Sequence, residues 1–126
     1  MNSLDRALSD FGAHIGMPGL ALGAGGNTAL QLESGRRVVF EPAGDEVLVY
    51  LSEPVPYDSA ERLHKAWRRA HYSRLDGWPV QAALREQDGL PRLLAVTRMA
   101  AADASAARLG QAVDYLSRWL DAARDD

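Results

Sequence analysis

Three short apolar runs with the character of β-strands follow one another in the first half of the chain, and they constrain the fold more than any other feature. The first alternates in polarity from Thr28, the second is RVVFE at Arg37–Glu41, and the third is VLVYLS at Val47–Ser52. Ser34-Gly35 and the residues around Gly44 have the chemistry of tight turns. Three short strands joined in this way predict an antiparallel meander.

An amphipathic helix is predicted before the meander. Leu4, Leu8, Phe11 and Ile15 are spaced by four, three and four residues, which places them on one helix face. The helix should end near Gly16, because a proline follows shortly and restricts the residue before it.

The second half of the chain predicts a helix, a hairpin and a last helix. Asp58 should cap a helix over about Ser59–Ala70, with Glu61 completing a capping box. The runs VQAALRE and RLLAVTR flank Asp88-Gly89 and predict two more strands. A final helix should begin near Asp103.

The expected order of elements is therefore α-β-β-β-α-β-β-α. This order predicts an α+β fold with a single antiparallel sheet of about five strands and three helices. A chain of 126 residues is long enough for one core, so we expect one domain over residues 1–126.

Composition excludes several functional classes. The chain has a net charge of -3 and a pI of about 5.6, so the broad basic surface of a nucleic-acid-binding protein is not expected. It lacks cysteine, which excludes disulfides and thiolate metal sites and fits a reducing compartment. No segment is long and apolar enough to span a bilayer, and the N-terminus does not resemble a signal peptide. We expect an unprocessed cytoplasmic protein.

The glycine-rich stretch GAGGN at residues 23–27 superficially resembles a phosphate-binding loop. It contains no lysine for a P-loop, and it lacks both the third glycine and the strand-to-helix context of a dinucleotide fingerprint. The stretch is therefore interpreted as a connector, and no cofactor is expected.

Catalytic and metal-binding groups are sparse. Glu61 and His64 form an EXXH pair, but a helical metal site needs further ligands from neighbouring helices, and no second motif exists. Solvated histidines are therefore the favoured interpretation of His14, His64 and His71. No serine lies in a GXSXG elbow. The sequence favours neither an enzyme nor a metal site.

Bulky apolar residues gather in and after the central helix: Leu63, Trp67, Tyr72, Trp78 and Val80. They are either ordinary core residues or a subunit interface, because aromatic residues are enriched in both settings. The pattern leaves both interpretations open.

The layout resembles the class I type III secretion chaperones, the family typified by the Tir chaperone. The resemblance runs through SLDRALSDFGAHIGMPGLAL, TALQLESGRRVVFEP and EVLVYLSEPV to the closing LGQAVDYLSRWLDAA, whose helix carries Trp119. The arginine-rich central helix, KAWRRAHYSR, departs from the family pattern. The resemblance implies a non-catalytic cytoplasmic homodimer that binds the N-terminal segment of a secreted effector and keeps it soluble and export-competent.

The resemblance also implies two sets of site residues. It places the dimer interface at the central helix and the strand after it, for which we nominate Leu63, Trp67, Trp78 and Val80. It places the effector-binding surface at the first helix and the meander, for which we nominate Leu4, Leu8, Leu30, Leu32, Val38 and Phe40. Alternation alone does not tell which strand face is exposed.

Two other functions stay open. The chain could be another protein-binding or adaptor module with this fold, or a small ligand-binding domain. Binding to the N-terminal segment of a secreted protein distinguishes the chaperone from both.

Overall fold

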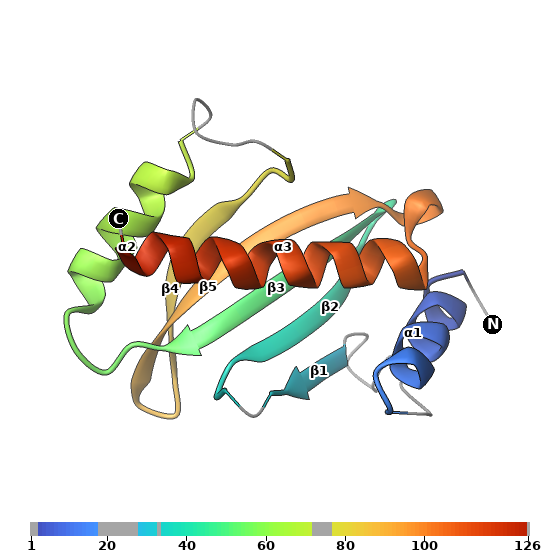
Figure 1. Ribbon diagram of the computed structural model, residues 1–126, viewed down its shortest axis with the longest axis horizontal. Coiled ribbons are helices and arrows are strands. Elements are labelled where there is room, and N and C mark those ends of the chain that lie inside the picture. Colours follow the sequence, from blue (N-terminus) through green and yellow to red (C-terminus); the bar gives the residue numbers. More distant parts are fainter. Residues whose placement is uncertain (1–2, 18–27, 33, 72–76, 126) are drawn as a thin grey trace.

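The computed structural model describes residues 3–17, 28–32, 34–71 and 77–125 (Figure 1). The predicted GAGGN connector and Tyr72 lie outside these residues. In chain order the elements are α1 (Ser3–His14), β1 (Thr28–Gln31), β2 (Arg37–Ala43), β3 (Glu46–Pro54), α2 (Ser59–Arg69), β4 (Gln81–Gln87), β5 (Leu90–Ala100), the 3₁₀ turn η2 (Ala101–Asp103) and α3 (Ala106–Asp125). The α+β fold class and the predicted order of helices and strands are confirmed.

The five strands form one antiparallel sheet in the order β1-β2-β3-β5-β4, so β1 and β4 are its edges. The turn predicted at Asp88-Gly89 joins β4 to β5, and both residues have positive φ, 54° and 79°. Such angles match the twist of a two-residue hairpin, and Asp and Gly tolerate them better than most residues. Local turn chemistry thus sets the register of this hairpin.

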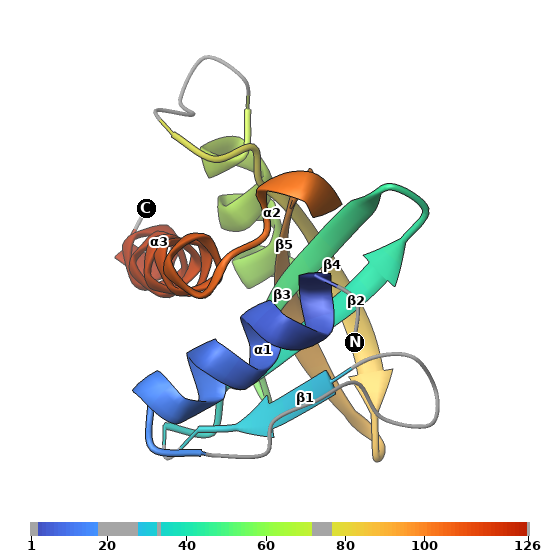
Figure 2. The same cartoon turned by 90° about the vertical axis from the view of Figure 1, so that its right-hand side faces the viewer.

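The helices α1 and α3 cover the same face of the sheet (Figure 2). The predicted stripe of α1 faces inward at Leu4, Leu8 and Phe11, which are at most 6% exposed. The ring of Phe11 meets Phe40 of β2 edge to face, with the ring centroids 5.5 Å apart. Each buried side chain of this size stabilises the fold by about 1.5–3 kcal/mol. The core therefore lies between this helical layer and the sheet.

The predicted capping box of α2 is wrong in its geometry. The helix starts at Ser59 as expected, but Asp58 has a left-handed backbone, with φ 55°, and its side chain makes no capping hydrogen bond. An N-cap residue normally has an extended backbone, which aims its side chain at the first free N–H groups. The left-handed conformation of Asp58 turns its carboxylate away from that position.

The last helix begins later than predicted. Residues Ala101–Asp103 form a 3₁₀ turn, and α3 starts at Ala106. The hydroxyl of Ser105 accepts a hydrogen bond from the backbone N–H of Arg108 at 3.2 Å, which is the geometry of an N-cap. Ser105, not Asp103, therefore defines the start of α3.

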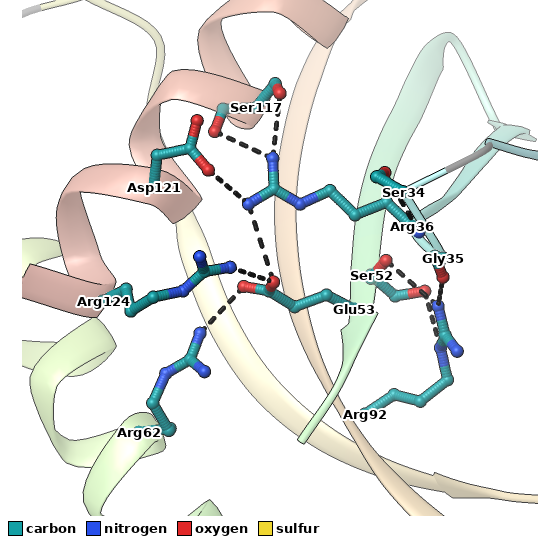
Figure 3. A network of polar contacts seen from close by, with 10 residues as sticks. All are labelled: Ser34, Gly35, Arg36, Ser52, Glu53, Arg62, Arg92, Ser117, Asp121 and Arg124. Atoms are coloured by element: carbon teal, nitrogen blue, oxygen red, sulfur yellow. Dashed lines mark hydrogen bonds and ion pairs between the residues drawn. The ribbon is translucent and has the colours of Figure 1, made fainter. Parts of the chain in front are cut away.

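A network of ion pairs joins α3 to the sheet and to α2 (Figure 3). Its centre is the carboxylate of Glu53 near the end of β3, whose side chain is 7% exposed. Three guanidinium groups surround it, at 3.6 Å for Arg36, 2.8 Å for Arg62 and 2.9 Å for Arg124. Arg36 also donates to Asp121 at 2.6 Å. The network holds the C-terminal half of α3 against the start of β2 and the end of β3.

Candidate functional site

A groove of about 670 Å³ opens between α1, the β1–β2 hairpin and the first half of α3. Its lining is mostly apolar or small: Phe11, Ile15, Met17, Leu30, Leu32, Val38, Ala106, Ala107, Gly110 and Val113, with His14, Gln31, Gln111 and Asp114 as its polar members. A concave apolar surface with a few polar groups is the usual form of a binding site.

The end of α1 forms the first wall of the groove. The backbone N–H of Met17 donates to the carbonyl of Gly12 at 2.6 Å, and that of Gly16 donates to Ala13 at 3.3 Å. Gly16 has φ 82°, so the helix closes in a Schellman motif. This turn leaves Ile15 and Met17 43% and 46% exposed. Two large apolar side chains therefore project at the rim of the groove.

The start of α3 forms the opposite wall, and its small residues leave the groove open. Ala106 and Ala107 lie in the first turn of the helix, and Gly110 lies in the next. A Cβ atom added at Gly110 would lie 3.7 Å from the Cε1 atom of Phe11, which is an ordinary contact. A small side chain thus fits at this position, whereas a long one would extend into the space of the groove.

The edge strand β1 borders the same groove. In the described part of the chain, β1 pairs with β2 alone. An edge strand presents unpaired backbone N–H and C=O groups on its outer side. A groove for apolar side chains beside such an edge is suited to an extended peptide, which can use both at once.

The structure separates the six predicted effector-binding residues into two groups. Leu30, Leu32 and Val38 line the groove. Leu4 and Leu8 on the inner face of α1 and Phe40 of β2 lie in the core and are at most 5% exposed. Only Leu32, at 36%, has a largely accessible side chain, because β1 ends at Gln31 and Leu32 follows it into the turn. The effector-binding role of all six residues remains a prediction.

Sequence reasoning missed the contribution of α3 to the groove. Ile15, on the α1 side of the groove, had a local sequence signal, because it belongs to the predicted apolar stripe of the first helix. Nothing in the local pattern of Ala106, Ala107 and Gly110 indicates that they face α1. These residues lie beside α1 only because α3, which begins about ninety residues after the end of α1, packs across the sheet.

The four predicted dimer-interface residues also differ in exposure. Trp67 of α2 is 56% exposed, whereas Val80 is 3% exposed and belongs to the core. Leu63 and Trp78 are half-buried against the core. The guanidinium of Arg108 in α3 lies 4.1 Å from the centre of the Trp78 ring, a cation–π contact that engages this ring within the monomer. Trp67 is thus the most accessible of the four.

The described residues contain neither a candidate metal site nor a candidate membrane span. Within the described residues, no three His, Cys, Asp or Glu side chains are grouped so that they could hold a metal ion. No described helix combines the length and the apolar character of a membrane span.

No family model matches the sequence, and no curated protein matches it. Three solved structures share its fold. A chain of the HopA1–SchA chaperone–effector complex is 17% identical, with a TM-score of 0.67 over 95% of this chain and 91% of that chain. A chain of the ExsC–ExsE complex is 22% identical, with a TM-score of 0.65 over 94% and 86%. YbjN from E. coli is 14% identical, with a TM-score of 0.58 over 90% and 83%.

Proposed function

We propose that this chain is a cytoplasmic chaperone that binds the N-terminal segment of a type III secreted effector and keeps it soluble and competent for export. In this role it is a single domain that acts without catalysis and without a cofactor. It recognises a polypeptide and neither nucleic acid nor a membrane. Its fold is shared with a chain of a chaperone–effector complex, which supports this assignment.

The observation that carries the proposal is the groove between α1, β1 and α3. Ile15, Met17 and Leu32 project at its rim, and water is displaced from them when a partner binds. Full burial of one such side chain contributes about 1.5–3 kcal/mol. An extended effector segment would place alternate apolar side chains in the groove and pair its backbone with β1.

The predicted effector-binding residues have two tasks in this proposal. Leu32 would contact the segment directly, and Leu30 and Val38 would form the floor below it. Leu4, Leu8 and Phe40 would act from within the core, where they support the floor. Binding would therefore depend on the first group through contact and on the second through the shape of the groove.

We also propose that the chaperone is a homodimer whose interface includes Leu63, Trp67, Trp78 and Val80. The exposed ring of Trp67 provides the apolar centre that such an interface needs. Arginines on the outer side of α2, including Arg68, would lie at the polar rim.

Co-expression with the N-terminal segment of a secreted protein encoded by a neighbouring gene tests the chaperone function. The segment should be insoluble alone and soluble with the wild-type chaperone. Leu32→Glu and Ile15→Glu should each weaken binding by more than about tenfold, because burial of the new charge opposes contact. Leu90→Glu is the matched control, because Leu90 is 54% exposed at the β4–β5 turn and does not line the groove.

Two results would contradict the proposal. If the segment neither binds nor gains solubility, the chain is not its chaperone, and an adaptor module of the same fold becomes the better assignment. If the segment binds but Leu90→Glu weakens binding as much as Leu32→Glu does, the groove is not the site of contact.

A further inference from the structure

A second pocket, of about 250 Å³, lies on the opposite face of the sheet from α1 and α3. The register of the paired strands determines which residues of the pocket share this face. Arg37 of β2 is directly opposite Ser52 of β3, and Ser52 is directly opposite Leu94 of β5. Directly opposed residues in antiparallel strands project on the same face. These three side chains therefore share the face that the helices leave open, and all three line the pocket.

The twist of the sheet closes this pocket from both edges. Ala29 of β1 and Arg85 of β4 both line it, although the two strands are at opposite ends of the sheet order. Leu94 is only 6% exposed, which is low for a residue on a face without a helix. Ala29, Val39 and Leu94 give the pocket an apolar part, and its other residues are polar or charged.

Two arginines at this pocket have unused hydrogen-bond donors. Arg85 makes no hydrogen bond or ion pair with any residue in the described part of the chain. Arg37 makes one long contact, 3.4 Å from Nε to the Gln31 side chain. A guanidinium group carries five N–H donors, so both have most of their capacity free. Two cations with free donors beside an apolar surface favour an anionic partner.

The neighbouring Arg92 shows that the positive charge here is not fully balanced. Three of its five N–H donors are used, by the Ser52 hydroxyl at 3.1 Å, the Ser52 carbonyl at 3.1 Å and the Gly35 carbonyl at 2.9 Å. Burial lowers the pKa of Arg92, and the charge of Arg37 lowers it further, while Glu53 opposes this effect. An anion between the arginines would relieve the repulsion.

One carboxylate already lines the pocket and limits the charge of any ligand. The Tyr50 phenol donates a hydrogen bond to the Glu41 carboxylate. The lining thus holds two guanidinium groups and one carboxylate. The net charge of +1 is neutralised by one carboxylate, whereas a doubly charged anion such as phosphate would leave an excess negative charge beside Glu41.

We propose that this pocket binds a single carboxylate group on a short apolar stem. Arg37 and Arg85 would hold the carboxylate, because the guanidinium fork matches its two oxygens. Ala29, Val39 and Leu94 would contact the stem. Such a group occurs in free short-chain carboxylic acids and in the glutamate side chain of a polypeptide. The site is separate from the groove and does not depend on the proposed chaperone function.

Titration of ¹⁵N-labelled protein with sodium butyrate, followed by NMR, tests the proposal. Butyrate carries one carboxylate on a three-carbon stem, and butyramide has the same stem without the charge. A saturable shift of the signals of Val39, Tyr50, Arg85 and Leu94 is expected with butyrate, and an affinity about tenfold lower or worse with butyramide. Sodium chloride at equal concentration corrects for ionic strength.

Variants distinguish a site from general attraction of anions. Arg37→Gln and Arg85→Gln should each reduce the butyrate affinity about tenfold or more. Arg98→Gln is the control, because Arg98 lies on the same face but does not line this pocket. Circular dichroism establishes that each variant is folded. Arg85→Lys keeps the charge without the fork and should retain part of the affinity.

A short peptide with one glutamate, compared with its glutamine counterpart, identifies the source of the carboxylate. Tighter binding of the glutamate peptide than of butyrate identifies a polypeptide ligand, and the reverse identifies a free acid; either result supports the site. Shifts with butyrate that do not exceed those with chloride overturn the proposal. So do shifts that remain unchanged in both glutamine variants.

Discussion

The indole Nε1 of Trp67 donates a hydrogen bond to the backbone carbonyl oxygen of Ala82 at a distance of 3.0 Å. This bond ties the outer side of α2 to the edge strand β4. A strand added to β4 would compete with the indole for the Ala82 carbonyl. The ring therefore protects this edge from strand addition while it presents an apolar face, 56% exposed, to any partner.

Substitution of Trp67 tests the proposed dimer. Trp67→Glu should convert the dimer to a monomer of 13.7 kDa, because a charge would replace the apolar centre of the interface. Trp67→Phe keeps the apolar ring and should remain dimeric. Light scattering at micromolar concentration measures the mass. A wild-type protein that is already monomeric, or a dimeric Trp67→Glu variant, would contradict this interface.

Substitution of Gly110 tests the groove from the side of α3. Gly110→Ala should stabilise the fold by about 0.5–1 kcal/mol, because glycine is a poor residue inside a helix and the added methyl group finds room beside Phe11. Gly110→Leu should leave a folded protein whose groove is partly filled. We expect normal effector binding for the alanine variant and weakened binding for the leucine variant, measured by urea unfolding and calorimetry. Equal binding by both variants would count against the groove.

Removal of the charge at Glu53 should destabilise the protein strongly. Glu53→Gln leaves Arg36, Arg62 and Arg124 close together without their central carboxylate, and removal of one partner from a buried ion pair costs about 3 kcal/mol or more. Glu61→Gln is the matched control. Its exposed pair with Lys65, at 3.7 Å, contributes less than about 0.5 kcal/mol. Urea unfolding of both variants measures the difference, and similar losses would refute the importance of the network.

Replacement of Thr97 should stabilise the protein. Its side chain is 2% exposed, and its hydroxyl has no hydrogen-bond partner within the described residues. Thr97→Val removes this unsatisfied group at nearly constant shape, and we expect a gain of about 1 kcal/mol. The reverse change at the directly opposite residue, Val49→Thr, should cost about 1–3 kcal/mol. Thermal unfolding compares the two, and a less stable Thr97→Val variant would show that the hydroxyl is satisfied.

Tyr50 should make stability sensitive to alkaline pH. Burial, the hydrogen bond to Glu41 and the charge of Glu41 raise its pKa from 10.0 to about 12, against the opposing charge of Arg85. The folded chain therefore keeps a proton that the unfolded chain releases. This contribution to stability is complete below about pH 10 and is lost as the pH rises to about 12.

The variant Tyr50→Phe has no such group. The stability of the wild type relative to Tyr50→Phe should fall between about pH 10 and about pH 12, as measured by urea unfolding. The comparison cancels the titration of the other tyrosines and of lysine. A difference that is independent of pH would show that the pKa of Tyr50 is not raised.

The sequence was sufficient to predict the order of elements, because each element carries a local signal. The period of Leu4, Leu8 and Phe11 indicates a helix, and Asp88-Gly89 indicates a hairpin whichever fold surrounds it. The two wrong predictions, the cap of α2 and the start of α3, both concern helix N-termini. Whether Asp58 or Ser105 caps a helix depends on one backbone dihedral, which residue type alone does not determine.

The groove was only partly predictable from the sequence, for a different reason. Leu8 and Leu32 are equally apolar, and only tertiary packing separates the residue inside the core from the one at its surface. The wall made by α3 and the network around Glu53 both join segments that are distant in the chain. The local pattern contains no information about such contacts.

The anchoring of α3 has a consequence for the thermodynamics of binding. The ties of Arg36 to Ser117 and Asp121 immobilise one end of a helix of 20 residues, and its other end is a wall of the groove. A wall that is already ordered loses little conformational entropy when a peptide arrives, so almost all of the entropy lost on binding belongs to the peptide. Among peptides that make the same contacts, those with the least freedom in solution should therefore bind most tightly.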